Sequence, residues 1–443
     1  LAWHKKCPLR STAPMRDFSR GLMNVLVTGA SGFIGSAVVD ALRSAGHRVI
    51  EGTRGSHAAQ SKETMDVDFT RDFDPATWRS KLTGIDAVVN AVGILRERGS
   101  QTFDALHVRA PRALFAACVD AGVTRVIQIS ALGADEDAIS AYHSSKRLAD
   151  EFLTAQPISS VIVQPSLVYG PGGESARLFD TLASLPWIPL PGDGMQRIQP
   201  IHLDDLVACI VALLERDRWR TARIALVGAE PTTLRDYLAS LARALGRPHI
   251  RFLLIPIAWV RAAASLGKIL PAALLDNETL AMLERGNVSD GADTQRILGA
   301  APRSIANFIP RHIASMARRR AQLNWLFPLL RLAIAAMWIV TGIVSIAVYP
   351  VADSYALLAR TGITGTFATA ALIGAAILDI ALGVASLVAP SRLLWWSQIA
   401  LIVGYTVIIS VWLPEFWAHP YGPVLKNLPI LSALLLLAFV EER

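Results

Sequence analysis

A tyrosine and a lysine four positions apart carry the clearest chemical signal in this chain. They lie in the segment Tyr142-His-Ser-Ser-Lys146, and this spacing places both side chains on one face of a helix. A lysine charge stabilises a phenolate and lowers the phenol pKa from about 10 toward working pH. Tyr142 can then pass a proton to a carbonyl oxygen while hydride moves to or from a second molecule. Ser130, at the end of a predicted strand over residues 126–130, can hydrogen-bond the same oxygen.

Glycines far upstream of this pair predict the binding element for a dinucleotide. Residues 24–28 form a short apolar run typical of a buried parallel strand, and GASGFIG leads from it into a helix predicted over residues 34–45. Glycines let the backbone approach a pyrophosphate at a helix N-terminus, although a purely structural turn is the alternative for this G-x-x-G-x-x-G spacing. The residues that we expect to contact the cofactor here are Thr28, Gly29, Ser31, Gly32, Phe33, Ile34 and Gly35.

The second predicted strand, over residues 47–53, indicates which dinucleotide binds. An acidic residue at its end would select NAD, but the sequence there reads Thr53-Arg54. A guanidinium suits a ribose 2′-phosphate by charge and by bidentate geometry, so we predict NADP(H) over NAD(H), with Glu51 pointing away. Asp68 follows a predicted strand over residues 65–67 and either meets the adenine edge or caps the next turn.

A third predicted strand, over residues 87–90, ends in small residues that allow the cofactor to lie close. These residues are Ala91, Val92 and Gly93. Tyr142, Lys146 and Pro165 complete the predicted cofactor-binding set.

Beyond Trp325 the chain becomes apolar enough to cross a membrane. The stretches 326–348, 367–388 and 393–413 each exceed twenty residues and can span a hydrocarbon core of about 30 Å. A fourth stretch, 428–440, reaches that length only if it begins near Tyr421 or if the bundle is locally thin. We therefore predict four transmembrane helices.

Basic residues predict how these helices are oriented. The arginines at 318–320 precede the first stretch, and Arg392 separates the second from the third. Arginines concentrate on the cytoplasmic side, so the nucleotide domain and both termini should be cytoplasmic, with the 413–427 loop outside. We expect a multi-pass protein of a bacterial inner membrane.

Ionisable residues at membrane depth are candidates for function. Asp379 lies near the middle of the second stretch, and Lys426 precedes the fourth. Arg331, Lys426 and the Gln398 amide are the expected partners of Asp379. The alternative is that Asp379 only joins the helices through a hydrogen bond.

Composition limits the partners. Residues 326–443 hold five basic and five acidic residues, so the formal charge of +7 resides in residues 1–325. We interpret this charge as attraction to an anionic leaflet and to nucleotide phosphates, and we expect no nucleic acid because no basic helix or aromatic-basic platform is evident. The cysteines, Cys7, Cys118 and Cys209, are too scattered for a metal site and fit a reducing compartment. Residues 1–22 are interpreted as an upstream extension or a disordered tail.

The motifs of the first part together resemble the extended short-chain dehydrogenase/reductase superfamily. They are TGASGFIG (28–35), NAVG (90–93), YHSSK (142–146), QPSLVYGPGG (164–173) and PIHLDDL (200–206). The segment ISALGAD (129–135) is similar to the atypical branch that contains the nucleotide-binding accessory subunit of respiratory complex I. The resemblance covers about residues 24–310.

This resemblance implies roles for individual residues. Tyr142 and Lys146 match the acid/base and the ribose anchor, and Ser130 matches the residue that orients substrate. The family's proton relay also uses an asparagine on a helix, here predicted over residues 103–119, where His107 occupies that position in LHVRAP. A histidine can carry protons itself. It can equally mark a site that binds nucleotide without catalysis, as the complex I relative is thought to do.

The membrane part is similar to the DoxX-like family of four-helix proteins through Asp379, Gln398, Tyr405, HPYGP and KNLP. That resemblance implies a membrane redox or quinone-linked association. Between the two parts, the unusually apolar stretch 252–275 is either ordinary core or a segment in the membrane interface that admits a lipid.

The expected architecture is a Rossmann-like doubly wound parallel α/β sheet with a small α/β substrate subdomain, followed by an all-α four-helix transmembrane bundle. The expected divisions are 1–22, 23–230, 231–322 and 323–443. The leading hypothesis is an NADPH-dependent oxidoreductase for a hydrophobic carbonyl or quinone-like substrate. The alternatives are a non-catalytic nucleotide-binding protein with respiratory-complex or homo-oligomer partners, and a nucleotide-gated conduit through the bundle.

Overall fold

The computed structural model describes residues 22–55, 63–216, 221–266 and 277–441. The predicted extension 1–22 and Cys7 therefore lie almost wholly outside the described residues, as does the part of the apolar 252–275 stretch beyond residue 266. The chain divides into two units, one up to Arg318 and one from Arg319. Each unit is described by itself.

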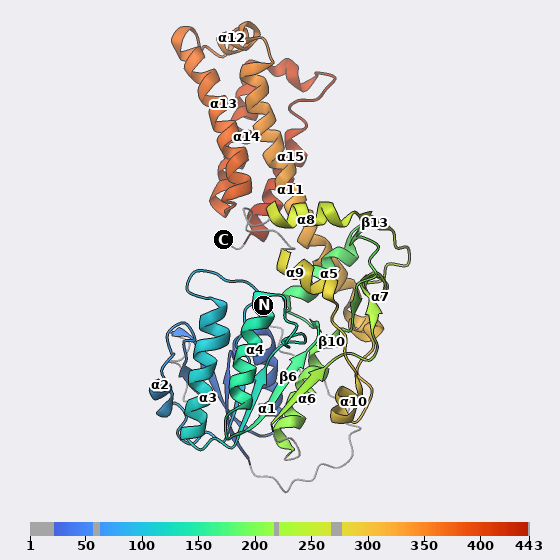
Figure 1. Cartoon of the computed structure of the whole chain (residues 1–443). Coiled ribbons are helices and arrows are strands. Elements are labelled where there is room, and N and C mark those ends of the chain that lie inside the picture. The colour runs from blue at the N-terminus through green and yellow to red at the C-terminus, as the bar shows by residue number, and fades with distance from the viewer. Residues whose placement is uncertain (1–21, 56–62, 217–220, 267–276, 442–443) are drawn as a thin grey trace. The chain divides into compact units, whose positions relative to one another are not determined.

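A seven-stranded parallel sheet forms the centre of the first unit (Figure 1). Its order is β11-β6-β5-β4-β1-β2-β3, and every neighbouring pair is parallel. This confirms the predicted doubly wound sheet. The order reverses between β1 and β4, which is where the carboxyl ends of such strands leave room for a ligand. The strands are β1 (Asn24–Thr28), β2 (Arg48–Thr53), β3 (Thr64–Asp66), β4 (Ala87–Asn90), β5 (Arg125–Ile129), β6 (Ser159–Pro165) and β11 (Ala222–Leu226).

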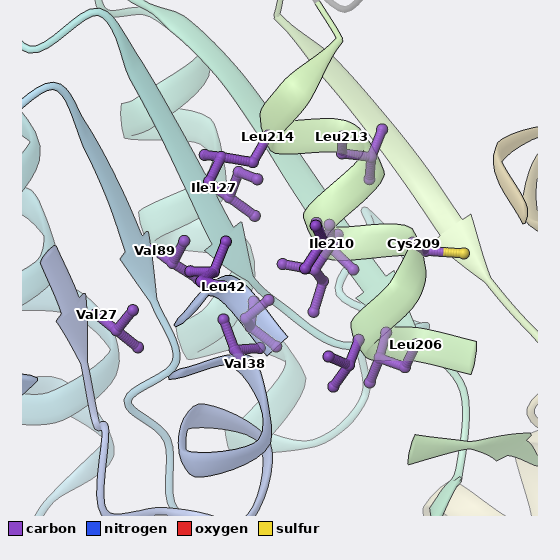
Figure 2. Packing of buried hydrophobic residues seen from close by; sticks show 14 of the residues in the cluster. Val27, Val38, Leu42, Val89, Ile127, Leu206, Cys209, Ile210, Leu213 and Leu214 are labelled. Carbon is purple, nitrogen blue, oxygen red and sulfur yellow. The ribbon is translucent and has the colours of Figure 1, made fainter. Parts of the chain in front are cut away.

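Helices cover both faces of this sheet, because successive strand side chains point to opposite sides. Val25 and Val27 of β1 pack into one core, while Leu26 packs into the other. Figure 2 shows the first core, in which Val38 and Leu42 of α1 meet Ile210 of α6. The helices of this face are α1 (Phe33–Ser44), α6 (Leu203–Glu215) and α10 (Ala292–Leu298); those of the other are α2 (Pro75–Arg79), α3 (Ala110–Asp120) and α4 (Ala141–Thr154).

A smaller cluster of elements, drawn from both sides of β11 in the sequence, has its own core, in which Tyr169, Tyr237 and Phe308 are buried. Helix α7 begins after Thr233, which caps it by accepting a hydrogen bond from the Asp236 N–H at 3.0 Å. The elements here are β7 (Val168–Tyr169), α5 (Glu174–Ser184), β8 (Ile188–Pro191), β9 (Arg197–Ile198), β10 (Ile201–His202), β12 (Thr232–Thr233), α7 (Leu234–Ala244), β13 (Phe252–Ile255), α8 (Ile257–Leu266) and α9 (Asn277–Arg285).

The second unit is helical. Its elements are α11 (Ala314–Ala347), which starts before the unit boundary, α12 (Val351–Arg360), α13 (Gly365–Val388), α14 (Arg392–Trp412) and α15 (Asn427–Val440). Three helices, α11, α13 and α14, are long and apolar enough to span a membrane, whereas α15 has 14 residues. Side chains of α11, α14 and α15 form one buried core, with Leu382 of α13 packed against it. Helix α12, in the connection between the first two spans, was not predicted.

Candidate functional site

The glycine turn after β1 is built so closely that side chains would not fit. Gly29 has φ of +72°, and a Cβ there would lie 2.9 Å from the Ala91 backbone at the end of β4. A Cβ at Gly35 would lie 2.0 Å from the Gly29 carbonyl oxygen. The turn therefore brings bare backbone to the N-terminus of α1 at the point where the sheet order reverses. These features fit a dinucleotide pyrophosphate, which needs close approach of backbone and a helix N-terminus.

Residues that follow β2 and β3 extend this site. Arg54 is exposed at the end of β2, and both of its Nη atoms lie 3.1 Å from the Gln101 side-chain oxygen when that amide faces its donors. Glu51 pairs instead with Arg43 of α1 at 2.8 Å, so its carboxylate is directed to that helix. Asp68 accepts hydrogen bonds from the Thr70 N–H at 2.9 Å and the Thr70 hydroxyl at 2.7 Å. Asp68 thus caps the next turn, which is the second of the two roles predicted for it from the sequence.

The pKa of Asp68 reflects the same contacts. Burial raises the pKa of this carboxyl, but the Thr70 hydrogen bonds and the charges of Arg71 and Arg54 together bring it below its usual value. The side chain is therefore ionised, and its charge lies near Arg54.

Lys146 is buried where the ends of β4 and β5 meet α4. Its ammonium donates hydrogen bonds to the Val92 carbonyl at 3.1 Å and the Ile129 carbonyl at 3.0 Å. A Cβ on Gly93 would lie 3.1 Å from Lys146 Nζ, so the glycine makes room for the lysine as well as for a cofactor. Burial lowers the pKa of Lys146, and the nearby Asp150 carboxylate opposes that change.

Tyr142 stands one helical turn before Lys146 and is surrounded by rings. The ring centroids of Phe103, His107 and His143 lie 6.1, 5.6 and 5.2 Å from that of Tyr142. Burial, together with the nearby Asp150 charge, raises the pKa of Tyr142 to about 12. The predicted lowering of this pKa is therefore wrong for the chain alone, because burial and the Asp150 carboxylate both disfavour the phenolate. Tyr142 is a neutral phenol, the form that can donate a proton.

His107 is held on both of its ring nitrogens. It lies in the π-helical turn η2 (Asp104–Arg109), which precedes α3. Its Nε2 accepts a hydrogen bond from the Ile94 N–H at 3.0 Å, so the proton is on Nδ1, which lies 2.9 Å from the Ser145 hydroxyl. Ser145 in turn donates to the Tyr142 carbonyl at 2.8 Å. Burial, with the Lys146 charge, lowers the pKa of His107 to about 2, so the ring is neutral.

A buried polar chain behind the site was not predicted from the sequence. The Thr28 hydroxyl donates to the Asn90 Oδ1 at 2.6 Å, and the Asn90 amide donates to Gln128 Oε1 at 2.7 Å. Gln128 also bonds to Asp150, to which the Ser130 hydroxyl donates a short hydrogen bond. Asp150 stands four residues after Lys146, on the same face of α4, and this spacing is the one feature of the sequence that could have indicated its place near the site. The chain links the glycine turn to Ser130 across three strands.

The protonation state of Asp150 determines whether the Ser130 hydroxyl can donate a hydrogen bond to a ligand. Burial raises the pKa of Asp150, and the Ser130 hydrogen bond and the Lys146 charge oppose that rise. While Asp150 is ionised it takes the only hydroxyl proton of Ser130, which then has only lone pairs for a ligand.

The later motif QPSLVYGPGG closes over the start of α1. The Phe33 ring lies so near Gly170 and Gly173 that Cβ atoms there would approach it to 3.4 and 2.8 Å. Pro165 ends β6, and its carbonyl accepts from the Leu132 N–H at 3.0 Å. The loop after β5 is also tied to α9, since Arg285 donates to the Gly133 carbonyl at 3.0 Å and pairs with Asp135 at 2.6 Å. The predicted residues of the first unit thus gather at one edge of the sheet.

In the membrane unit, two of the expected partners of Asp379 are engaged elsewhere. Arg331 pairs with Glu441 at 2.6 Å. Gln398 accepts from the Trp338 indole at 2.8 Å and donates to Ser386 at 2.9 Å. The prediction that either side chain would partner Asp379 is therefore wrong, because both are bonded to other polar groups. Asp379 is buried on α13, and its Oδ1 accepts no hydrogen bond from any described residue, while Lys426 is exposed just before α15.

The fold and the site together define a nucleotide-binding unit of the Rossmann type that carries a tyrosine–lysine pair, joined to an apolar helical unit. Comparison with known proteins identifies the families. Residues 25–228 match the NAD dependent epimerase/dehydratase family, and residues 335–435 match the DoxX-like family. The chain is 30% identical over 260 residues to an epimerase family protein of Mycobacterium bovis, which covers 54% of this chain and 84% of that protein. The chain belongs to the NAD dependent epimerase/dehydratase family.

Other relatives carry more specific names. A ceramide reductase of Caulobacter vibrioides is 28% identical over 235 residues, covering 52% of this chain and 73% of that protein. Subunit 9 of the NADH dehydrogenase [ubiquinone] 1 alpha subcomplex of Arabidopsis thaliana is 25% identical over 248 residues, covering 54% and 62%. A nucleoside-diphosphate-sugar epimerase structure from Staphylococcus aureus aligns with a TM-score of 0.51 at 15% identity over 65% of this chain and 99% of that one, which supports the fold alone.

These findings confirm the resemblances given by the sequence. The chain combines an NAD(P)-binding domain, similar to extended short-chain dehydrogenases and to the complex I subunit, with a membrane-associated DoxX-like domain.

Proposed function

We propose that this protein is a membrane-anchored, NAD(P)H-dependent oxidoreductase that acts on a hydrophobic carbonyl or quinone-like substrate. The observation that carries the proposal is the placement of Tyr142 and the buried Lys146 on α4, beside the glycine turn that fits a dinucleotide. A tyrosine beside a lysine can serve as the proton donor or acceptor for a substrate oxygen.

Each side chain has a distinct part in this proposal. NADPH, when bound, supplies hydride. Tyr142 is protonated at neutral pH and donates its proton to the substrate oxygen, while Lys146 holds a positive charge at the ends of β4 and β5. His107 positions Tyr142 by way of Ser145 and the Tyr142 carbonyl. Ser130, whose proton is taken by Asp150, is restricted to accepting a hydrogen bond until Asp150 becomes protonated.

The lipid-soluble class of substrate is inferred from the second unit and from a relative. Three apolar helices of the same chain are long enough to span a membrane. A ceramide reductase is among the related proteins, and the substrate in its name is a lipid. Quinones and long-chain carbonyl compounds would reach this enzyme through the membrane in the same way.

The proposal includes NADP(H) as the preferred cofactor. Arg54 is exposed at the end of β2, the position from which a guanidinium can bind a ribose 2′-phosphate, and Glu51 is paired with Arg43. We propose a bacterial inner membrane as the location, with the nucleotide domain and both termini cytoplasmic. Asp379 and Lys426 remain the candidates for function within the membrane.

The second candidate function is a non-catalytic NADPH-binding assembly or sensor protein of a respiratory or membrane redox complex. One observation favours it: both nitrogens of His107 are bonded to Ile94 and Ser145, so the ring connects neither Tyr142 nor Lys146 to a proton relay. Its relative in the NADH dehydrogenase of Arabidopsis thaliana points the same way. This candidate would bind NADPH tightly and co-purify with other subunits or with further copies of itself.

The Tyr142→Phe variant separates the two functions. We expect it to bind NADPH like the wild type and to oxidise it about 10²–10⁴-fold more slowly with extracted membrane lipids in nanodiscs, because only the proton donor is removed. The absorbance at 340 nm measures turnover. Tyr237→Phe is the control, since Tyr237 is buried away from this site and its hydroxyl has no hydrogen-bond partner among the described residues. Unchanged turnover in Tyr142→Phe would remove this side chain from the mechanism.

A further inference from the structure

The segment from Phe252 to Ala262 is apolar, yet none of its side chains is buried. It comprises β13, Pro256 and the first part of α8 and reads FLLIPIAWVRA. Leu253 and Leu254 are 52% and 53% exposed, and Trp259 is 73% exposed. Strand β13 pairs only along one side, with β8, so its outer edge is left open within the described chain. An exposed apolar surface of this kind normally marks a contact with a membrane or a partner.

Aromatic and basic side chains border this surface. Trp187, which directly precedes β8, is 53% exposed, and the Arg251 guanidinium lies 5.3 Å from the centre of its ring. Residues 243–262 contain four arginines, Arg243, Arg247, Arg251 and Arg261, and no acidic residue. Tryptophan and arginine beside aliphatic side chains are the composition found at the boundary between lipid headgroups and acyl chains.

We propose that residues 252–262 and Trp187 form a membrane-docking surface that lies in the headgroup region of an anionic bilayer. Leu253, Leu254 and the two tryptophans enter the acyl boundary, and the exposed Arg251 meets lipid phosphates. Arg261 is paired with Glu284 at 2.9 Å and so adds little to this attraction. We choose a bilayer as the partner of this surface because the nucleotide-binding unit is joined covalently to helices that can span a membrane. Three arginines, at 318–320, lie where the two units join. The inference does not depend on catalysis.

A lipid-quenching experiment on the full chain tests this surface. Leu254→Cys and Trp259→Cys are labelled with a small fluorophore in nanodiscs that contain anionic lipid, in a Cys7→Ser background; Cys118 and Cys209 are fully buried and resist labelling. Nitroxide lipids report contact with acyl chains, and iodide reports contact with water. Leu148→Cys on α4, which is also exposed, is the matched control.

We expect nitroxide lipids to quench the labels at 254 and 259 several-fold more than the label at 148, and to quench them less when neutral lipid replaces anionic lipid. Quenching by iodide alone would show that the segment faces water and would overturn the proposal. Protection from both quenchers would also overturn it, because the surface would then be covered by protein, either the membrane unit or a second copy of the chain.

Discussion

At the scale of single residues, burial sets the protonation of the side chains around Tyr142. The pKa of Tyr142 is raised, that of His107 is lowered to about 2, and that of Asp150 is raised, each chiefly because the charged form is desolvated. The site therefore holds a neutral phenol and a neutral imidazole at neutral pH. This state suits proton donation to a substrate oxygen.

The neutral state of His107 predicts a dependence of stability on pH. Its pKa is about 2 in the folded chain and 6.5 by its ordinary value, so below pH 6.5 the unfolded chain binds one more proton than the folded chain. The contribution is present above pH 6.5 and is lost as the pH falls. The free energy of unfolding should decrease by up to about 1.4 kcal/mol per pH unit on this account.

His107→Gln should reduce that slope, because glutamine does not titrate. The measurement is urea unfolding of the full chain in nanodiscs at pH 5 and pH 7, read by proteolysis of the nucleotide-binding unit. His143 and His202 also have lowered pKa values, and the comparison with wild type isolates His107 from them. Equal slopes in the two proteins would contradict the buried neutral imidazole.

Arg54 predicts the choice of cofactor. Arg54→Ala should weaken NADPH binding by about 10–100-fold, the loss of roughly 1.5–3 kcal/mol from hydrogen bonds between charged groups, and leave NADH binding unchanged. Fluorescence titration of both nucleotides measures this. Arg79→Ala, another exposed arginine of the same unit, serves as control. A wild-type protein that binds NADH more tightly than NADPH would refute the role of Arg54.

At the scale of elements, the turn between β1 and α1 and the helix α4 place the two halves of the site. The turn presents backbone, and α4 presents Tyr142, Lys146 and Asp150 on one side of the sheet end. The polar chain from Thr28 to Asp150 joins them through the interior. A substitution in the turn between β1 and α1 should therefore weaken NADPH binding more than it destabilises the fold.

Gly35→Ala tests the turn. Its Cβ would lie 2.0 Å from the Gly29 carbonyl oxygen, so the backbone must move and the contact surface for a pyrophosphate is lost. We expect NADPH binding to become undetectable by calorimetry. Gly291→Ala is the control, because the nearest atom to a Cβ there is a side-chain nitrogen at 3.5 Å. Normal affinity in Gly35→Ala would show that the nucleotide lies elsewhere.

The sequence predicted elements with strong periodicity or turn signals and missed those that depend on neighbours in space. Strands β1 to β5 and helix α1 follow from local pattern, and each was predicted to within one residue of its observed bounds. Asp150 and Gln128 are distant in sequence from Thr28, and only the strand order brings them into one hydrogen-bonded chain. Two partners of Asp379 were predicted wrongly because the hydropathy of a helix does not show which of its side chains face a neighbouring helix.

At the scale of the whole molecule, a nucleotide-binding unit and an apolar helical unit are joined in one chain. Neither unit by itself indicates the substrate. In the proposed function, the nucleotide site would supply reducing equivalents when NADPH is bound, and three helices of the other unit are long and apolar enough to span a membrane. Their combination favours a reaction on a molecule that is itself dissolved in the membrane.

The proposed function requires the nucleotide-binding unit to lie on the cytoplasmic side of the membrane. Cysteine at position 421, in the predicted external loop, should react with an impermeant maleimide on intact cells, whereas cysteine at 389, between α13 and α14, should react only after lysis. Both Tyr421 and Ala389 are exposed, so accessibility within the fold does not differ. Labelling of position 389 alone in intact cells would place the nucleotide-binding unit on the wrong side for cytoplasmic NADPH.

The most direct test of the account is the transfer of deuterium from NADPH labelled at the reactive C4 position of the nicotinamide. Wild-type protein in nanodiscs is incubated with this NADPH and extracted membrane lipids, and the lipids are analysed by mass spectrometry. For a carbonyl substrate, the account predicts a lipid alcohol that keeps one carbon-bound deuterium with the wild type and at least about 100-fold less of it with Tyr142→Phe. A quinol would exchange its deuterium with water, so reduction of a quinone is read instead from the oxidation of NADPH. NADPH that stays bound and reduced, with no deuterium in any lipid, would contradict an oxidoreductase and favour the sensor or assembly protein.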